Sequence, residues 1–330
     1  MSILSPMTEP LTIWCNPLIS EAARQLLITG ARPHRLIFPP ITTYNLHAGP
    51  PDPALLEADV VFGQPDPATV MTSQTVRWIH LTSAGYARYD RPHFRAALAA
   101  RGVILTNSSQ VYAEPCAEHL LAFMLANARQ LPFTSRVQLT ERSWPTEPLR
   151  VASRLLIGQT VVLLGFGAIA RRLVELLQPF AMKIVAIRSR RSGNEGVQII
   201  LEDELEGALA EADHVVNTLP EKDETAKFVH AARFQAMKPG AIFYNVGRGS
   251  TVDQEALLAA LESERLGAAY LDVTAPEPLP PDHPLWTARG CYITPHTAGG
   301  HSDEHERFVR HFLDNLRRFV EGERLLDRIM

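Results

Sequence analysis

The sequence predicts an α/β protein built from two doubly wound domains, each with a parallel sheet. Three observations predict this class. The chain has 330 residues, more than one hydrophobic core usually organises, so two domains are expected. Short apolar runs alternate with helical patterns in two separate series. The second series opens with a glycine-rich turn, Gly165-Phe166-Gly167-Ala168-Ile169-Ala170.

The first series covers the first hundred residues. Its helical patterns, Glu21–Leu27 and His93–Ala100, separate apolar runs that are short enough to be strands. Parallel strands need such crossover segments, and the helices then cover both faces of the sheet. Proline is dense in residues 39–67, where long or irregular loops are expected. The expected strands are Leu11–Trp14, Arg35–Phe38, Val60–Phe62, Val76–Leu81 and Val103–Thr106.

A long and mostly apolar helical pattern, Cys116–Arg129, lies between the two series. Because it has no wide polar face, it is expected to be buried between domains or between subunits. This burial favours a homodimer. Leu131–Ser153 has no clear period. We expect it to be irregular and to form an arm that packs on a partner.

The second series starts at Thr160 and predicts six strands with crossover helices. Such a doubly wound sheet binds its ligand at the carboxyl ends of the strands. The last helical pattern, Asp303–Val320, is polar on one face and follows the final strand. The expected strands are Thr160–Leu164, Lys183–Ile187, His214–Asn217, Ala241–Val246, Ala269–Val273 and Cys291–Thr294, and the expected helices include Ile169–Leu177, Glu202–Ala210 and Gln254–Leu261.

The glycine-rich turn is typical of a dinucleotide-binding site. Gly165 permits the tight turn, Gly167 lets the backbone approach a pyrophosphate, and Ala170 keeps the helix close to the strand. The start of the following helix supplies free N–H groups and a partial positive charge for the diphosphate. A flexible loop with the same spacing by chance is the alternative, which the strand–turn–helix context disfavours.

A cluster of arginines then indicates which dinucleotide is bound. Arg188, Ser189, Arg190 and Arg191 stand where a dinucleotide fold often carries an acid. An acid there accepts hydrogen bonds from a bare ribose 2′-OH, whereas arginines favour a 2′-phosphate. The cluster therefore predicts NADP, with NAD as a further possibility. The alternative is an ordinary exposed group of arginines.

Composition excludes several other classes of protein. The net charge is −4, so neither nucleic acid nor an anionic membrane is an expected partner. No apolar stretch approaches the roughly 20 residues that span a bilayer. Met1–Pro10 does not have the basic and apolar parts of a secretory signal. Cys15, Cys116 and Cys291 are far apart and lack metal-ligand spacing, which fits a reducing, cytoplasmic location.

Three later segments lie at or just beyond the ends of expected strands. They are Asn245-Val246-Gly247-Arg248-Gly249, the run Leu271-Asp272-Val273-Thr274-Ala275-Pro276-Glu277-Pro278-Leu279, and Thr294-Pro295-His296-Thr297-Ala298-Gly299. Together they resemble the D-isomer-specific 2-hydroxyacid dehydrogenase family, over nearly the whole chain. Met237-Lys238-Pro239-Gly240 and Val252-Asp253 extend the resemblance. It implies a Rossmann coenzyme domain at 109–299, and a flavodoxin-like substrate domain at 1–108 and 300–330.

The resemblance implies a role for each of four residues. Arg248 would bind the substrate carboxylate and polarise the 2-oxo group, because a guanidinium fork suits a planar anion. His296 would be the acid in reduction and the base in oxidation. Glu277 would hold the far nitrogen of His296 and favour the protonated ring. Asp272 would orient the nicotinamide carboxamide. Taken singly, His296 could equally be a hydrogen-bonded core histidine, Arg248 a salt-bridge partner at a strand end and Glu277 a solvated loop acid.

The resemblance also implies the binding residues. Ser83, Ala84 and Gly85 follow an expected strand, and their backbone N–H groups would hold the substrate carboxylate opposite Arg248 and His296. The acid that often follows that glycine is replaced here by Tyr86, with Asp90 further on, so the substrate preference is open. The coenzyme residues implied are Gly165, Phe166, Gly167, Ala168, Ile169, Arg188, Ser189, Arg190, Leu219, Pro220, Val246, Gly247, Asp272 and Gly299.

The expected activity is NADPH-dependent reduction of a small 2-oxo acid, of the glyoxylate or hydroxypyruvate type, to the D-2-hydroxy acid. Formate dehydrogenase-like and non-catalytic corepressor-like proteins share the fold and are the alternatives. A methyltransferase could use a similar glycine-rich turn, but it would not need the arginines at 188–191, because its cofactor presents a ribose diol and no 2′-phosphate. Trp286 could cover the active site or pack in the core.

A metal site is disfavoured. The run His301-Ser302-Asp303-Glu304-His305 matches the H-x-x-E-H pattern of inverted zinc proteases. However, Ser302 or Asp303 suits a helix N-cap, and few residues remain to supply a third ligand.

Overall fold

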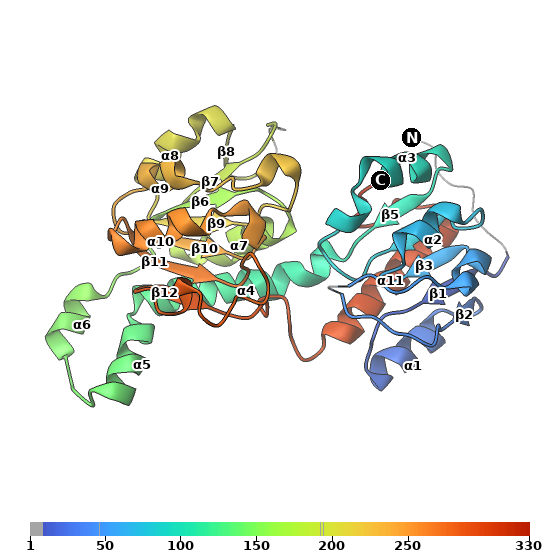
Figure 1. Ribbon diagram of the computed structural model, residues 1–330, viewed down its shortest axis with the longest axis horizontal. Helices are drawn as coiled ribbons and strands as arrows, with labels where there is room; N and C mark the ends of the chain where they lie inside the picture. The colour runs from blue at the N-terminus through green and yellow to red at the C-terminus, as the bar shows by residue number, and fades with distance from the viewer. Residues whose placement is uncertain (1–8, 46, 192, 194) are drawn as a thin grey trace. The chain divides into compact units, whose positions relative to one another are not determined.

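The structure is a computed structural model that describes residues 9–45, 47–191, 193 and 195–330. Residues 1–8, most of the segment weighed above as a secretory signal, lie outside the described residues. The chain divides into two compact units. Unit 1 consists of the chain up to Tyr112 together with His301–Met330, and unit 2 is Ala113–Gly300 (Figure 1). Each unit is an α/β structure, as the sequence predicts.

Unit 1 contains a five-stranded sheet in which every neighbouring pair is parallel. The order β2-β1-β3-β4-β5 is the flavodoxin-like order. This confirms the strands predicted from the short apolar runs. The strands are β1 Thr12–Cys15, β2 Arg35–Ile37, β3 Val60–Phe62, β4 Trp78–His80 and β5 Ile104–Thr106.

Helices cover both faces of this sheet, since successive side chains of a strand point to opposite faces. The helices α1 (Glu21–Gly30) and α11 (Glu304–Glu321) pack on one face, where Phe312 stacks on Phe62 with 4.1 Å between ring centres. The helices α2 (Pro67–Thr72) and α3 (Pro92–Ala100) pack on the other face. α2 was not predicted, because six residues are too few to show a helical period.

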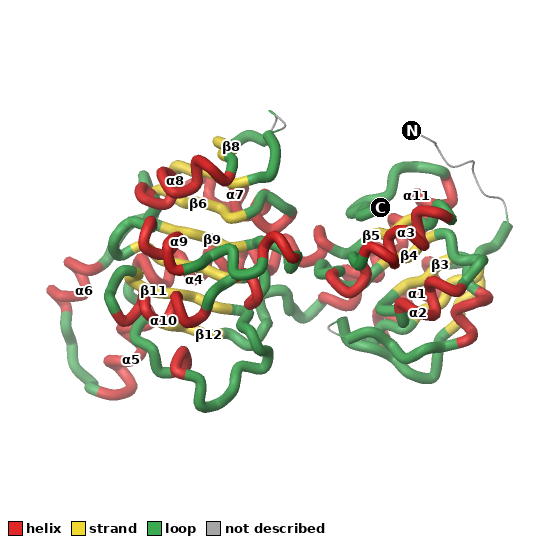
Figure 2. The backbone as a smooth tube through the Cα atoms, turned by 45° about the horizontal axis from the view of Figure 1, so that its top comes forward, coloured by secondary structure: helices red, strands yellow, loops and turns green. Residues whose placement is uncertain are grey.

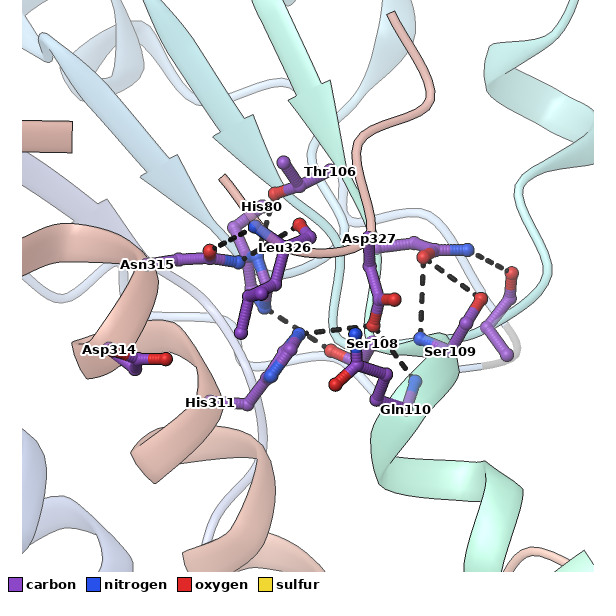
Figure 3. A network of polar contacts seen from close by, with 12 residues as sticks. His80, Thr106, Ser108, Ser109, Gln110, His311, Asp314, Asn315, Leu326 and Asp327 are labelled. Carbon is purple, nitrogen blue, oxygen red and sulfur yellow. Dashed lines mark hydrogen bonds and ion pairs between the residues drawn. The ribbon is translucent and has the colours of Figure 1, made fainter. Parts of the chain in front are cut away.

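Polar contacts hold the end of the chain to α11 and to the residues that follow β5 (Figure 3). Asn315 on α11 bonds both the N–H and the carbonyl of Leu326, at 2.7 and 3.3 Å. His311 lies 3.2 Å from Asp327, whose carboxylate also accepts the N–H of Gln110 at 2.8 Å. His80 is fully buried beneath them. Burial, reinforced by the nearby His311, holds the pKa of His80 well below its ordinary value.

Unit 2 contains a seven-stranded parallel sheet of order β12-β11-β10-β9-β6-β7-β8, which is the Rossmann order with one added strand. β6, β7 and β9 have the predicted bounds. β8 was not predicted, because three residues at a sheet edge form no long apolar run. The strands are β6 Thr160–Leu164, β7 Lys183–Ile187, β8 Gln198–Ile200, β9 His214–Asn217, β10 Ala241–Asn245, β11 Leu266–Leu271 and β12 Cys291–Ile293.

Helices also lie on both sides of this sheet (Figure 2). On the helix α4, Phe123 packs on Tyr270 of β11 with 4.6 Å between ring centres. None of the helices of the described residues is long and apolar enough to cross a membrane. The helices are α4 Ser109–Ala128, which contains the division between the units, α7 Ala168–Leu177, α8 Leu205–Glu211, α9 Ala231–Ala236 and α10 Gln254–Glu262.

The expectation that Leu131–Ser153 is irregular is wrong. This segment contains the helices α5 (Leu131–Thr140) and α6 (Thr146–Ala152), which form an arm at the edge of unit 2 (Figure 1). Proline at the first turn starts α5. Only Val137 of the two helices is buried, so the apolar period that normally reveals a helix is missing.

Candidate active site

The segments predicted to carry chemistry in unit 2 follow strands of one parallel sheet. The carboxyl ends of parallel strands meet at one edge, so the loops after β6, β9, β10, β11 and β12 lie along that edge. The strand order reverses between β6 and β9. Ligands of open α/β sheets bind at this switch point.

The glycine-rich turn has the geometry that a diphosphate requires. Gly165 has φ of 91°, which glycine adopts readily, and a Cβ atom there would lie 3.2 Å from Thr218 Oγ1. Gly167 is the N-cap residue of α7 and offers no side chain to its first-turn N–H groups. A Cβ atom at Gly167 would meet no atom of the described residues within 4 Å. Ala170 is fully buried against the strand. These residues fit a dinucleotide.

The arginine cluster follows β7. Arg188 bonds the carboxylate of Glu195 at 3.1 Å, and that carboxylate is only 4% exposed. Arg191 bonds the Ile199 carbonyl at 3.1 Å and also Glu204. Arg190 and Ser189 are exposed. The cluster therefore consists of two arginines with acidic partners and one that faces solvent.

The loop after β10 is built by close backbone packing. A Cβ atom on Gly247 would lie 2.7 Å from the Leu219 carbonyl, and one on Gly249 would lie 2.0 Å from the Thr274 carbonyl. Glycine is required at both positions for this approach. Arg248 is therefore held between the loops that follow β9 and β11, and its guanidinium bonds the Gly247 carbonyl at 2.6 Å.

A buried polar network, which the sequence analysis did not identify, fixes the backbone of Arg248. Its carbonyl accepts from Asn245 at 3.2 Å and from Thr251 at 2.7 Å. Asn217 joins the two by bonds of 3.0 and 2.7 Å. Buried polar groups of this kind are stable only when they are hydrogen-bonded. The only signal in the sequence is an asparagine at the end of each of two apolar strands.

His296 and Glu277 form a direct pair. His296 Nδ1 lies 2.8 Å from Glu277 Oε2, and Glu277 Oε1 accepts the Thr274 N–H at 3.0 Å. Burial acts to raise the pKa of Glu277, but the hydrogen bond and charge of His296, the Thr274 N–H and the charge of Arg248 together lower it. Glu277 is therefore an anion that faces the ring of His296. This pair engages Nδ1, so Nε2 is the ring nitrogen of His296 that Glu277 does not hold.

The backbone of His296 is in the left-handed region, with φ of 54°. This conformation costs a residue other than glycine about 1–3 kcal/mol and persists where neighbouring contacts impose it. Here the His296 N–H bonds the Asp272 carbonyl at 2.9 Å. The Asp272 carboxylate accepts the N–H groups of Thr297 at 2.8 Å and Ala298 at 3.0 Å. Asp272 thus holds the turn on both sides of His296. Its expected contact with the nicotinamide carboxamide stays a prediction.

The predicted substrate loop belongs to unit 1. Gln64 donates to Ser83 Oγ at 3.0 Å, Ser83 donates to the Gly85 carbonyl at 2.6 Å, and Asn107 donates to the Ala84 carbonyl at 2.6 Å. Within the described ranges, the N–H groups of Ala84 and Gly85 have no acceptor. The loop therefore has a fixed backbone with two N–H groups available to an anion.

Three other residues of interest have local partners. Tyr86 packs against the buried core beneath α2 and α3, and Asp90 pairs with Arg95. Trp286 is 47% exposed and donates its indole N–H to the Pro280 carbonyl at 2.9 Å.

The histidines of the zinc-like run also have partners. His301 Nδ1 lies 2.8 Å from Asp303, and His305 Nδ1 accepts the Ser20 N–H at 3.0 Å. No group of three or more metal-binding side chains occurs among the residues that the structure describes.

Comparison with known proteins identifies the family. Residues 121–298 match the model of the D-isomer specific 2-hydroxyacid dehydrogenase NAD binding domain. The chain is 35% identical over 241 residues to an uncharacterized protein in the proB 3′ region of Corynebacterium melassecola, covering 71% of this chain and 78% of that protein. It is 30% identical over 268 residues to glyoxylate/hydroxypyruvate reductase B of Yersinia pestis, covering 79% of each.

Some relatives are longer, and the chain covers 44% of D-3-phosphoglycerate dehydrogenase of Mycobacterium tuberculosis, with 30% identity. Among solved structures, a D-isomer specific 2-hydroxyacid dehydrogenase family protein of Aeromonas salmonicida is 28% identical, with a TM-score of 0.75 over 98% of this chain and 99% of that one. The chain therefore belongs to the D-isomer specific 2-hydroxyacid dehydrogenase family and is an oxidoreductase with a nicotinamide-binding domain.

Proposed function

We propose that this protein is a cytoplasmic, NADPH-preferring reductase that converts a small 2-oxo acid, of the glyoxylate or hydroxypyruvate type, to the D-2-hydroxy acid. The observation that carries the proposal is the 2.8 Å pair of His296 and the anionic Glu277, with the charge of Arg248 acting on the same carboxylate. An acid, its orienting anion and an anion-binding cation are the groups that ketone reduction next to a carboxylate needs.

Each protein group has a defined task in this proposal. The guanidinium of Arg248 binds the carboxylate and attracts electrons from the 2-oxo oxygen. A bound nicotinamide coenzyme supplies the hydride. As negative charge develops on the oxygen, His296 Nε2 gives it a proton, and Glu277 stabilises the charged ring beforehand. In oxidation the neutral ring takes the proton back. The N–H groups of Ala84 and Gly85 contribute a second anion site.

The residues of the unit 2 edge suit the coenzyme. Gly165 to Ile169 would hold the diphosphate at the start of α7, and Leu219, Pro220, Val246, Gly247, Asp272 and Gly299 would hold the nicotinamide half. Arg188, Ser189 and Arg190 would bind the 2′-phosphate. Arg190 faces solvent and can bind the phosphate directly, whereas Arg188 would exchange its bond to Glu195 for one to the phosphate.

We also propose that the protein is a homodimer that associates through the arm, residues 131–157. The arm exposes large apolar side chains: Leu139 is 79% exposed, Trp144 93% and Val151 73%, and Leu131, Leu155 and Ile157 are exposed as well. A cluster of exposed apolar side chains on one segment marks an interaction surface.

Replacing His296 with Ala should lower kcat for reduction by about 10²–10⁴-fold, because the proton donor is lost. Coenzyme binding should persist, since His296 belongs to a different loop from the glycine-rich turn. Steady-state oxidation of NADPH and fluorescence titration of bound NADPH measure the two effects. His230→Ala, which changes an exposed histidine of the same unit, is the matched control. Near-normal turnover of the His296 variant would overturn the proposal.

Replacing Glu277 with Gln should lower kcat for reduction about tenfold to hundredfold and remove the acid limb of kcat/KM, because an amide neither orients His296 as an anion does nor takes up a proton. In the wild type, kcat/KM should fall on the acid side only at a pH below the ordinary pKa of a glutamate. The pKa of Glu277 is lowered below its ordinary 4.5, so the pair persists above that value and is lost only as the pH falls through the lowered one. A normal kcat and an unchanged acid limb in the variant would exclude this role for Glu277.

Replacing Arg188 and Arg190 together with Ala should raise KM for NADPH about tenfold or more while KM for NADH changes less than about twofold, because only NADPH carries the 2′-phosphate. Arg289→Ala is the control, since Arg289 is an exposed arginine of the same unit that pairs with Glu264 and lies outside the cluster. Equal effects on both coenzymes would remove the 2′-phosphate role.

Light scattering of the purified protein should give twice the chain mass of 36.6 kDa. The double variant Leu139→Ser and Trp144→Ser should be monomeric at micromolar concentration, because two exposed apolar contacts are lost. Tyr44→Ser, which changes an exposed aromatic of unit 1, should leave the mass unchanged. A monomeric wild type, or a double variant that is still dimeric, would contradict this interface.

A further inference from the structure

Three side chains from distant parts of unit 2 form a series of hydrogen bonds that ends at the turn that carries His296. His119 belongs to α4, Asp272 follows β11, and Thr294 follows β12. His119 Nε2 lies 3.2 Å from Thr294 Oγ1, and Thr294 Oγ1 donates to Asp272 Oδ1 at 2.6 Å. The distance from His119 Nε2 to Asp272 Oδ1 is 3.9 Å. Thr294 therefore connects the histidine with the carboxylate.

The protons available on these three side chains fix the donor and the acceptor of each hydrogen bond between them. An ionised carboxylate can only accept, so the single hydroxyl proton of Thr294 must point to Asp272. The lone pairs of Thr294 Oγ1 then face His119, so His119 must donate from Nε2. Burial outweighs the attraction of Asp272 and lowers the pKa of His119 below its ordinary value. His119 is thus a neutral ring with its proton on Nε2.

The Asp272 carboxylate, where this series of hydrogen bonds ends, is held by several donors and cannot rotate. Asp272 Oδ1 accepts from Thr294 Oγ1, from the Thr297 N–H and, at 3.1 Å, from the Ala298 N–H, and Oδ2 accepts the same Ala298 N–H. The backbone carbonyl of Asp272 accepts the His296 N–H. One residue therefore anchors the backbone before and after a histidine whose φ is positive.

His119 also has an aromatic neighbour. Its ring meets the ring of Phe123 edge-on, with 4.4 Å between centres, and its side chain is 21% exposed. An apolar ring could make the same edge-on contact. The polar contact with Thr294 is the feature that distinguishes the imidazole from an apolar side chain of similar size.

We propose that His119 and Thr294 are positioning residues for His296. By orienting the Asp272 carboxylate, they hold the 294–298 turn in the conformation that keeps His296 Nδ1 on Glu277 and Nε2 available to the substrate. This inference rests on the proposed role of His296. Neither residue touches the substrate, so removing either should affect the chemical step and leave binding of the acid intact.

Thr294→Val tests the central link, because valine keeps the shape and removes only the hydroxyl. We expect kcat for 2-oxo acid reduction to fall about tenfold to hundredfold, while KM for the acid changes less than about twofold. Thr294→Ser restores the hydroxyl and should recover kcat to within about threefold of wild type. Thr287→Val, at an exposed threonine of the same unit, is the matched control. A normal kcat in Thr294→Val, or no recovery in Thr294→Ser, would overturn the proposal.

His119→Phe tests the first link. It should lower kcat in the same manner. The double variant with Thr294→Val should have the same kcat as Thr294→Val alone, because both substitutions break the same series of hydrogen bonds. Multiplicative effects would show that the two residues act independently, and the proposal would fail. Nitrogen NMR of histidine-labelled protein, with His119→Phe to assign the signal, should show a neutral ring protonated at Nε2 at neutral pH. A proton on Nδ1 would also overturn it.

The outcome for His296 separates this inference from the function on which it rests. If His296→Ala retains turnover, the proposed acid role of His296 fails, and with it the need for other residues to position His296. If His296→Ala abolishes turnover while His119→Phe and Thr294→Val keep a normal kcat, only the positioning role fails. The NMR measurement does not depend on activity and tests the assigned hydrogen bonds in either case.

Discussion

The parallel register of the unit 2 sheet is the constraint on which its site depends. Because β6, β9, β10, β11 and β12 all run in one direction, five loops that are far apart in the chain finish at one edge. A parallel sheet buried on both faces leaves little room for polar side chains along its strands. The chemistry-bearing residues therefore accumulate where the strands end.

Converging loops still need to be held, and buried polar side chains do this at both ends of the site. Asn217 and Thr251 fix the carbonyl of Arg248, while Asp272 fixes the turn around His296. A buried polar group costs stability unless each of its hydrogen-bonding atoms has a partner. Because these groups satisfy each other across loops, a displacement of one loop leaves the others with unpaired atoms. The arrangement therefore favours one conformation of the edge over alternatives.

The sequence predicts the strands well where an apolar run is long, and poorly where tertiary contacts decide. β6, β7 and β9 have the predicted bounds, whereas β8 and the arm helices carry no periodic apolar pattern and could not be found. For the site, the resemblance to a family supplied Arg248, Glu277 and His296. The partners His119 and Thr294 are 175 residues apart in the chain, so no local pattern could link them.

The ring and the backbone of His296 place opposite demands on the structure. In the proposed reaction the ring exchanges a proton, so it needs a partner such as Glu277 that tolerates both charge states without moving. The backbone must not move at all, although its φ of 54° is unfavourable for histidine. Asp272 meets the second demand by bonding backbone N–H groups and the Thr294 hydroxyl, none of which titrates in the proposed reaction. Separating the titrating pair from the structural anchor lets the charge of the ring change while its position stays the same.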